Sequence, residues 1–364
     1  MVNRLVWQNL LHRPVRTLLS VAAVAVEVVL ILIVVGLSQG MLEESQRRAR
    51  GVGADILIRP STSQVAMGLS SAELSQKLVD LFADMPSVQA AAGTTVYLFP
   101  NLQTITGVDL ESFSRLSGGL KYLAGGPFGD PYEAVVDEVW ARQNRLGVGS
   151  TTEIWNRQFR VTGIVEPGKL SRVFIPMATM QDLLGWKGKL SQIYLKLRRP
   201  EETPSVIAEL NRLLPAAKIY SMEEFTSLIS IHNIGGLSQF ITVIIGLAVT
   251  VGFLVVMLAM YTAILERTRE IGILKSLGAS RLYIVGVVMR ETLLLTALGI
   301  GAGILLSFAA SAAIQKSYPI LTVTLHRDWW LYAGLIAVGG AGLGALYPAA
   351  RAAAQDPIAA LAYE

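Results

Sequence analysis

Long apolar runs separated by polar stretches dominate the pattern of this chain. The first run, residues 18–37, is interrupted only by Glu27, and three more follow within residues 240–265, 283–314 and 329–350. At about 1.5 Å per helical residue, each run is long enough to cross a hydrocarbon core of about 30 Å. The pattern predicts four transmembrane helices, over residues 18–40, 239–265, 283–314 and 329–350.

A different pattern fills residues 41–238, between the first and second spans. Charges, prolines and turn residues occur throughout this stretch, as in a folded water-soluble domain. Alternating positions predict strands within residues 53–60, 88–99, 102–108, 151–155 and 159–165. Helices are predicted from a Ser70–Glu73 capping box onward, beginning with Leu74, and near residues 132–146, 177–184 and 204–214. This order of elements is that of a mixed α+β domain.

Charges in the short loops predict the orientation of the chain. The loop 266–282 carries four basic residues, whereas the loop 315–328 carries only Lys316 and Arg327. Because short cytoplasmic loops are enriched in Lys and Arg, we expect residues 266–282 in the cytoplasm. An interfacial helix at residues 1–17 and a tail at residues 351–364 would then be cytoplasmic as well. The predicted fold class is an α-helical membrane protein with four transmembrane helices and a mixed α+β extracytoplasmic domain inserted between the first and second.

Composition narrows the classes of function. Hydrophobic residues make up 52% of the chain and charged residues only 16%, with a mean hydropathy of +0.49, so a membrane is the expected environment. The basic residues are scattered, which argues against a nucleic acid partner. The chain has no cysteine, and its three histidines are far apart in sequence, so we expect no metal site. The acidic run 130–138 is read as the start of a helix, and no catalytic group emerges.

Within the spans, small residues and one acid stand out. Residues 299, 303, 307 and 311 are Gly or Ser, and residues 337, 341, 345 and 349 are all Ala. Gly299, Gly303, Gly340 and Gly344 are predicted to let helices approach closely, between spans or between subunits. Glu27 lies half way through the first span, where an ionised carboxylate is costly, and we expect it to be neutral or paired within a dimer. Arg290 and Glu291 are expected to have structural roles near the cytoplasmic surface.

The cytoplasmic loop has the pattern of a short amphipathic helix. It reads ERTREIGILKSLGASR from Glu266, with Ile271, Ile273, Leu274 and Leu277 able to bury in a groove while its charged residues stay solvated. Gly278 would end this helix. A helix lying on the membrane surface would have a similar pattern, so periodicity alone leaves the role of the loop open.

This loop closely resembles the coupling segment of the MacB/FtsX-like permease family of ABC transporters. Family members read ER-x-x-EIG-x-LK-x-LGA-S after the second membrane helix, and the residues that match are Glu266, Arg267, Glu270, Ile271, Gly272, Leu274, Lys275, Gly278 and Ala279. Further family landmarks occur in order along the chain, namely GADILIRP, GVDLESF, YEAVVDEVWARQNRLGVGS, FRVTGIVEP, VFIPMATMQDLLG and YPAARAAAQDPIAALAYE.

The resemblance implies a non-catalytic permease of a bacterial inner membrane. It would pair with a second copy or a related permease, contact membrane lipid, and leave room for a periplasmic adaptor. Two ABC ATPase subunits would bind ATP and Mg and push on residues 266–282, so that motion passes to the outer domain by mechanotransmission in efflux or extraction. This chain has no G-x-x-x-x-G-K-[ST] phosphate loop and needs no cofactor of its own.

Two alternatives stay open at the level of sequence. A signalling permease that activates a cell-wall hydrolase would have the same architecture. An ion-coupled carrier would instead use Glu27 and would need no ATPase.

Overall fold

The structure is a computed structural model that describes residues 14–62, 72–99, 104–231 and 233–356. The predicted interfacial helix and the last residues of the tail lie largely outside this part of the chain, as does Ser70. The described residues separate into two compact units, a helical unit and an α/β unit. Of the described residues, 14–39, 239–316 and 323–356 form the helical unit, and those within 40–238, together with 317–322, form the α/β unit.

Four helices in the described part of the chain are long and apolar enough to cross a membrane. They are α2 (Pro14–Arg50), α9 (Leu237–Glu266), α11 (Arg281–Ser317) and α12 (Arg327–Ala354). The proline at the start of α2 suits a first helical turn, where no N–H is required. At 37 residues, α2 is about 55 Å long, which exceeds the core of a bilayer, so the helix continues well past the predicted end of the first span.

Glycines set the packing of α11 against α2. A Cβ atom built on Gly299 would lie 2.6 Å from Val24 Cβ, and one on Gly303 would lie 2.8 Å from Val28 Cβ. Both distances are too short for any side chain larger than hydrogen, so the two helices meet at their backbones. Gly301, on another face of α11, has no atom within 4 Å of such a Cβ.

The small residues of α12 pack inward as well. Ala333, Ala337, Ala341, Ala345 and Ala349 are all nearly inaccessible to solvent. A Cβ atom on Gly344 would lie 2.7 Å from the carbonyl oxygen of Phe253 in α9, and one on Gly340 would lie 3.5 Å from Val249 Cγ1. The small-residue positions therefore serve contacts between the helices of one chain.

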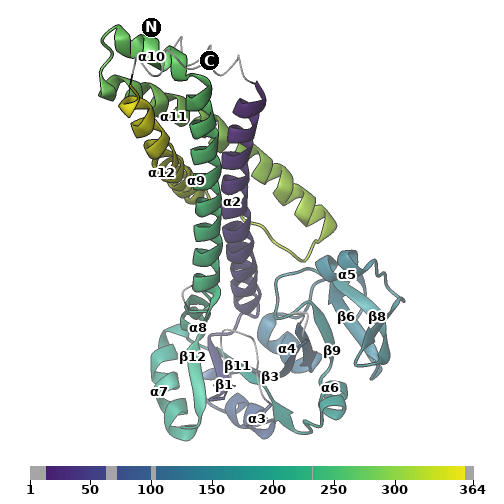
Figure 1. The fold of residues 1–364 in the computed structure, drawn as a ribbon. Helices are drawn as coiled ribbons and strands as arrows, with labels where there is room; N and C mark the ends of the chain where they lie inside the picture. Colours follow the sequence, from purple (N-terminus) through teal and green to yellow (C-terminus); the bar gives the residue numbers. More distant parts are fainter. Residues whose placement is uncertain (1–13, 63–71, 100–103, 232, 357–364) are drawn as a thin grey trace. The chain divides into compact units, whose positions relative to one another are not determined.

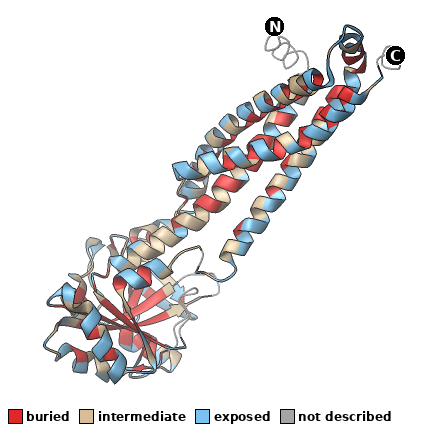
Figure 2. Ribbon diagram, turned by 90° about the vertical axis from the view of Figure 1, so that its left-hand side faces the viewer, coloured by how far each residue is buried: buried red, intermediate tan, exposed pale blue. Residues whose placement is uncertain are grey.

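A mixed sheet forms the centre of the α/β unit, and its strands are mostly buried (Figure 2). In the described residues it has 10 strands in the order β12-β1-β11-β3-β4-β9-β6-β8-β5, with β7 paired to β8. The strands are β1 (Ile56–Pro60), β3 (Val88–Leu98), β4 (Thr104–Val108), β5 (Tyr122–Gly125), β6 (Glu133–Asp137), β7 (Thr151–Ile154), β8 (Arg157–Val165), β9 (Val173–Pro176), β11 (Gln192–Leu197) and β12 (Ala217–Ser221). Strands β2 (Leu74–Ser75) and β10 (Lys189–Leu190) form a separate pair. Pairs β4–β9 and β6–β8 are parallel.

Short helices cover the sheet. They are α3 (Lys77–Ala83), α4 (Leu110–Ser117), α5 (Glu138–Asn144), α6 (Met177–Leu184), α7 (Thr203–Leu213) and α8 (Met222–Leu228), with a 3₁₀ turn at Pro200–Glu202. Phe113 and Leu116 of α4 pack against Leu57 and Tyr194 of the sheet.

Two predicted helices begin later than the sequence pattern indicated. Leu74 lies in strand β2, and the helix that follows starts at Lys77. The helix predicted from residue 132 starts at Glu138, because residues 133–137 form strand β6. Strand β6 is buried along its whole length between β8 and β9, so its sequence lacks the alternation that marks a half-exposed strand. Strands β5, β6, β9, β11 and β12 were not expected from the sequence.

Candidate functional site

The predicted coupling segment folds as a short helix, α10 (Thr268–Ser276), between α9 and α11 (Figure 1). Arg267, which separates α9 from α10, has non-helical backbone angles, so the chain turns there. Gly278 ends α10 with a φ of +94°, a left-handed conformation that favours glycine. The Ala279 N–H then donates a hydrogen bond to the Leu274 carbonyl, at 3.0 Å. Gly278 and Ala279 therefore terminate the helix.

One face of α10 is packed against the helical bundle. Ile271 is 9% exposed and joins a core cluster with Met260 and Ile264 of α9 and with Ile284 and Val288 of α11. Gly272 is buried next to it. A cavity of about 80 Å³ lies in this interface, and Glu270, Ile271 and Leu274 contribute to its lining from α10. Burial of this face holds α10 against the ends of α9 and α11.

An ion pair fastens the beginning of α10. Arg267 Nη1 lies 3.2 Å from Glu291 Oε2 of α11, and the two side chains are 14% and 4% exposed. The prediction from the sequence that Arg267 stays solvated is therefore wrong. Glu291 was expected to have a structural role, but its partner is 24 residues away along the chain, so the sequence did not reveal the pairing.

The end of α10 is fastened by Lys275. Its Nζ donates a hydrogen bond to the Ala353 carbonyl at 3.0 Å, and another to the Gln355 carbonyl. These carbonyls lie at the carboxyl end of α12, where helix carbonyls lack partners and a cation is favoured by the helix dipole. Sequence reasoning missed this contact, because Lys275 and Ala353 are 78 residues apart. Helix α10 is thus tied to α9, α11 and α12.

The rest of the α10 surface is open. Arg269 and Glu270 are exposed, as is Glu266 at the end of α9. Leu274 is 38% exposed, Ile273 44% and Leu277 79%. Of the nine matching residues, Arg267, Ile271, Gly272 and Lys275 are buried in the bundle or bonded to it, and Gly278 and Ala279 end the helix. Glu266, Glu270 and Leu274 are exposed. An apolar strip flanked by charges is the surface expected of a helix that docks into a groove of another protein.

A second cluster of charges lies in the α/β unit, around the far end of α2. Arg172 Nη1 is 3.0 Å from Asp137 Oδ2, and its Nη2 is 3.7 Å from Glu44 Oε1 of α2. The side chains of Arg172, Asp137 and Glu44 are 10%, 1% and 12% exposed. Arg48, one turn beyond Glu44, accepts a hydrogen bond at its carbonyl from the Leu170 N–H, at 3.1 Å. The outer end of α2 is therefore embedded in the domain through a buried charge network.

Asp137 has two roles in this network. Its Oδ1 accepts a hydrogen bond from the Trp140 N–H at 2.7 Å and so caps α5, while its Oδ2 faces Arg172. Burial raises the pKa of the Asp137 carboxyl above its ordinary value, against the opposing attraction of Arg172 and the cap hydrogen bond. The acidic run was read as a helix start, which holds for Asp137 and Glu138. Glu133 instead sits in β6 and pairs with Arg160.

The Glu133 carboxylate also accepts hydrogen bonds from the N–H groups of Gly129, at 2.8 Å, and Asp130, at 3.1 Å. These donors, with Arg160, hold the pKa of Glu133 below its ordinary value. Among the described residues, no group of three or more His, Asp or Glu side chains is arranged to hold a metal ion.

Comparison with known proteins identifies both parts of the chain. Residues 17–213 match the family model of the MacB-like periplasmic core domain, and residues 242–357 match that of the FtsX-like permease C-terminal domain. The uncharacterized ABC transporter permease YknZ of Bacillus subtilis is 26% identical over 99% of this chain and 98% of its own length.

The macrolide export ATP-binding/permease protein MacB of Escherichia coli is 23% identical over 97% of this chain and 59% of its own length. This chain thus spans about three fifths of the length of that MacB protein. Among solved structures, the periplasmic region of MacB from Actinobacillus actinomycetemcomitans aligns with a TM-score of 0.39 and 17% identity, over 50% of this chain and 94% of that one. Both family models match in order, and the described residues include four helices long and apolar enough to cross a membrane, so the chain belongs to the MacB/FtsX-type family of ABC transporter permeases.

Proposed function

We propose that this permease couples ATP hydrolysis by a separate ATPase subunit to a conformational change of its extracytoplasmic domain, and thereby exports or extracts a substrate. The observation that carries the proposal is the surface of α10. Its Ile273, Leu274 and Leu277 side chains remain exposed, while Arg267 and Lys275 fasten the same helix to α11 and α12. A force applied to this surface would therefore be transmitted directly to α11 and α12 through the Arg267 and Lys275 contacts.

The outer end of α2 supports the same mechanism. Because α2 is one continuous helix from Pro14 to Arg50, a tilt or shift of its membrane part moves Glu44 and Arg48 as well. The buried pairing of Arg172 with Glu44 and Asp137 would pass that displacement to the sheet at β6 and β9. Rigid secondary-structure elements of this kind can carry energetic coupling between α10 and a distant domain.

Assembly and orientation follow from this mechanism. Two permeases, either two copies or a related pair, would work with two ATPase subunits, and both termini and α10 would face the cytoplasm. The basic residues of the α10 loop agree with that orientation. A periplasmic adaptor would act on the extracytoplasmic domain, and the cargo would be handled there.

Site-specific crosslinking tests the proposal, because the chain has no cysteine and any introduced thiol is unique. Leu277→Cys places a photo-crosslinker on the exposed surface of α10. Tyr318→Cys, at a 57% exposed position just after α11, is the matched control. We expect Leu277→Cys to capture a nucleotide-binding subunit in membranes and Tyr318→Cys not to. Capture of that subunit at neither position, or at Tyr318→Cys alone, would refute the coupling role of α10.

A further inference from the structure

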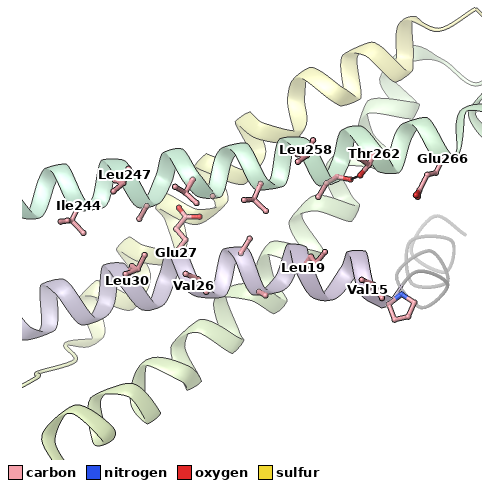
Figure 3. A pocket seen from close by; sticks show the side chains of 18 residues that line it. Val15, Leu19, Val26, Glu27, Leu30, Ile244, Leu247, Leu258, Thr262 and Glu266 are labelled. Atoms are coloured by element: carbon pink, nitrogen blue, oxygen red, sulfur yellow. Dashed lines mark hydrogen bonds between the residues drawn. The ribbon is translucent and has the colours of Figure 1, made fainter. Parts of the chain in front are cut away.

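Glu27 occupies a notch between helices of the helical unit that the proposed mechanism does not use. The side chain extends from α2 toward α9 (Figure 3) and is 3% exposed. A Cβ atom on Gly252 of α9 would lie 2.0 Å from Glu27 Oε2, and one on Gly340 of α12 would lie 3.8 Å from Oε1. Glycines on two neighbouring helices thus make the space for this carboxyl group.

The notch offers Glu27 no donor. Its Oε1 atom is buried and has no hydrogen-bond partner among the described residues. Thr250, the hydroxyl residue nearest to Gly252 in sequence, donates to the Gly246 carbonyl of its own helix, at 2.8 Å. A buried carboxyl group without a donor is strongly disfavoured in its ionised form.

The helices packed against α2 also place no Lys, Arg or His beside Glu27. Helix α9 has no Asp, Glu, Lys, Arg or His between Leu237 and Leu265, and its Tyr261 is nine residues, or about 13 Å, beyond Gly252. Helix α12 has no charged residue between its first two residues and Arg351, which is 11 residues, or about 16 Å, beyond Gly340. The tyrosines of α12 lie seven or more residues from Gly340. Helix α11, which packs on α2 through Gly299 and Gly303, is uncharged from Thr292 to Gln315.

The remaining ionisable residues of these helices therefore lie toward their ends. The acidic and basic ones are Arg16, Glu43, Glu44, Arg47, Arg48 and Arg50 of α2, Glu266 of α9, Arg281, Arg290, Glu291 and Lys316 of α11, and Arg327, Asp328 and Arg351 of α12.

The carboxyl group is nevertheless connected to the outside of the bundle. Glu27 and Gly252 contribute to the lining of a groove of about 1060 Å³ between α2 and α9, which is otherwise almost wholly apolar. The groove extends to Thr262 and Glu266 at the end of α9 (Figure 3). A separation of α2 from α9 along this groove would bring Glu27 into contact with water.

We propose that Glu27 is a proton-binding site whose occupancy is coupled to the contact between α2 and α9. With the helices in contact, the carboxyl group carries a proton. When they separate, the O–H bond breaks, the proton passes to water, and the carboxylate keeps the electron pair. The ionised form resists re-entry into the Gly252 notch, so closing requires that a proton be taken up. This inference does not depend on an ATPase partner.

Infrared spectroscopy of the full chain in nanodiscs tests the protonation state. The carbonyl stretch of a carboxylic acid is separate from the bands of a carboxylate, and the difference between wild type and Glu27→Gln isolates the contribution of Glu27. We expect a carboxylic acid band at neutral pH that Glu27→Gln lacks. A carboxylate difference band at neutral pH would overturn the proposal.

A second pair of variants covers the case in which Glu27→Gln fails to fold. Gly252→Ala places a methyl group in the notch, whereas Gly246→Ala adds one on the same helix where no atom lies within 4 Å. We expect Gly252→Ala to displace the carboxyl group and shift or abolish the acid band, and Gly246→Ala to leave it unchanged. Equal spectra for the two variants would contradict the assignment of the band to this notch.

Spin labels on Leu19 and Leu258, which are 62% and 64% exposed on the two sides of the groove, measure the coupling. In this cysteine-free chain we expect the distance between the labels to lengthen at alkaline pH, and not to do so in a chain that also carries Glu27→Gln. The same response in both chains, or no response in either, would overturn the coupling between proton and helix contact.

Discussion

Replacing Arg172 by Met should destabilise the α/β unit strongly. The change removes the cation that contacts both Asp137 and Glu44, whose side chains are only 1% and 12% exposed. Arg47, whose Nε lies 3.8 Å from Glu44 Oε2, and the partly buried Arg48 stay in place and offset part of the two negative charges. Arg172 makes the direct ion pair with Asp137, and removing one partner of a buried ion pair costs about 3–5 kcal/mol. For a unit of about 200 residues, each kcal/mol corresponds to about 2–4 °C in Tm. We therefore expect the Tm of the unit to fall by roughly 6–20 °C.

The assay is thermal unfolding of the full chain in nanodiscs, followed by tryptophan fluorescence. Trp140 is a suitable probe, because it is 7% exposed and its backbone N–H donates a hydrogen bond to Asp137 at 2.7 Å, so its ring lies next to the network. The matched control is Arg142→Met, which breaks an ion pair with Glu138 between side chains that are 63% and 44% exposed. Exposed pairs contribute little, so this control should leave Tm within experimental error. If Arg172→Met lowers Tm no more than Arg142→Met, the reasoning on the buried network is refuted.

The stability of the α/β unit should depend on pH through Asp137, and the sign of this dependence follows from its pKa. Burial raises the pKa of Asp137 in the folded wild type, so this carboxyl group favours folding most below its unfolded pKa and progressively less as pH rises through its folded pKa. Loss of Arg172 removes an attraction for the ionised carboxylate of Asp137 and so raises the pKa of that group further. The loss of unfolding free energy in Arg172→Met relative to wild type should therefore grow as pH rises through the folded pKa of Asp137. Adding Asp137→Asn should make the loss smaller than the sum of the two single effects, because neither charge then stays buried alone.

Three further outcomes are expected. Lys275→Met should lower the hydrogen-exchange protection of α10 by about tenfold or more, since hydrogen bonds to a charged donor contribute about 1.5–3 kcal/mol. Unchanged protection would mean that the contact of Lys275 with α12 does not stabilise α10. Gly303→Leu should cost about 1–3 kcal/mol by overpacking against α2, measured as a lower Tm of the helical unit, whereas Gly301→Leu, where no atom lies within 4 Å, should be nearly neutral. Wild type should lose stability as pH falls below about 4, through the lowered pKa of Glu133, and Glu133→Gln should lose less over that range in acid titrations of Tm.

Local features of the fold were predictable wherever one segment carried the whole signal. The end of α10 follows from Gly278, because the left-handed backbone there favours glycine whatever surrounds it. Strands β1, β3 and β8 were expected within three residues of their bounds, whereas β6 was taken for helix because burial on both faces erased its alternation. The contacts that hold α10 were not predictable, because Glu291 and Ala353 reach it from distant parts of the chain.

Taken alone, the sequence determined that this chain crosses a membrane with four helices around an inserted domain, because the length and hydropathy of a span are properties of one continuous segment. It also determined which loop carries the coupling pattern. Only the tertiary structure decided that Arg172 joins α2 to the sheet and that Glu27 meets Gly252 without a cation nearby. The physical reason is that ion pairs, notches and their desolvation depend on distances between segments, and those distances are set when the helices and strands pack together.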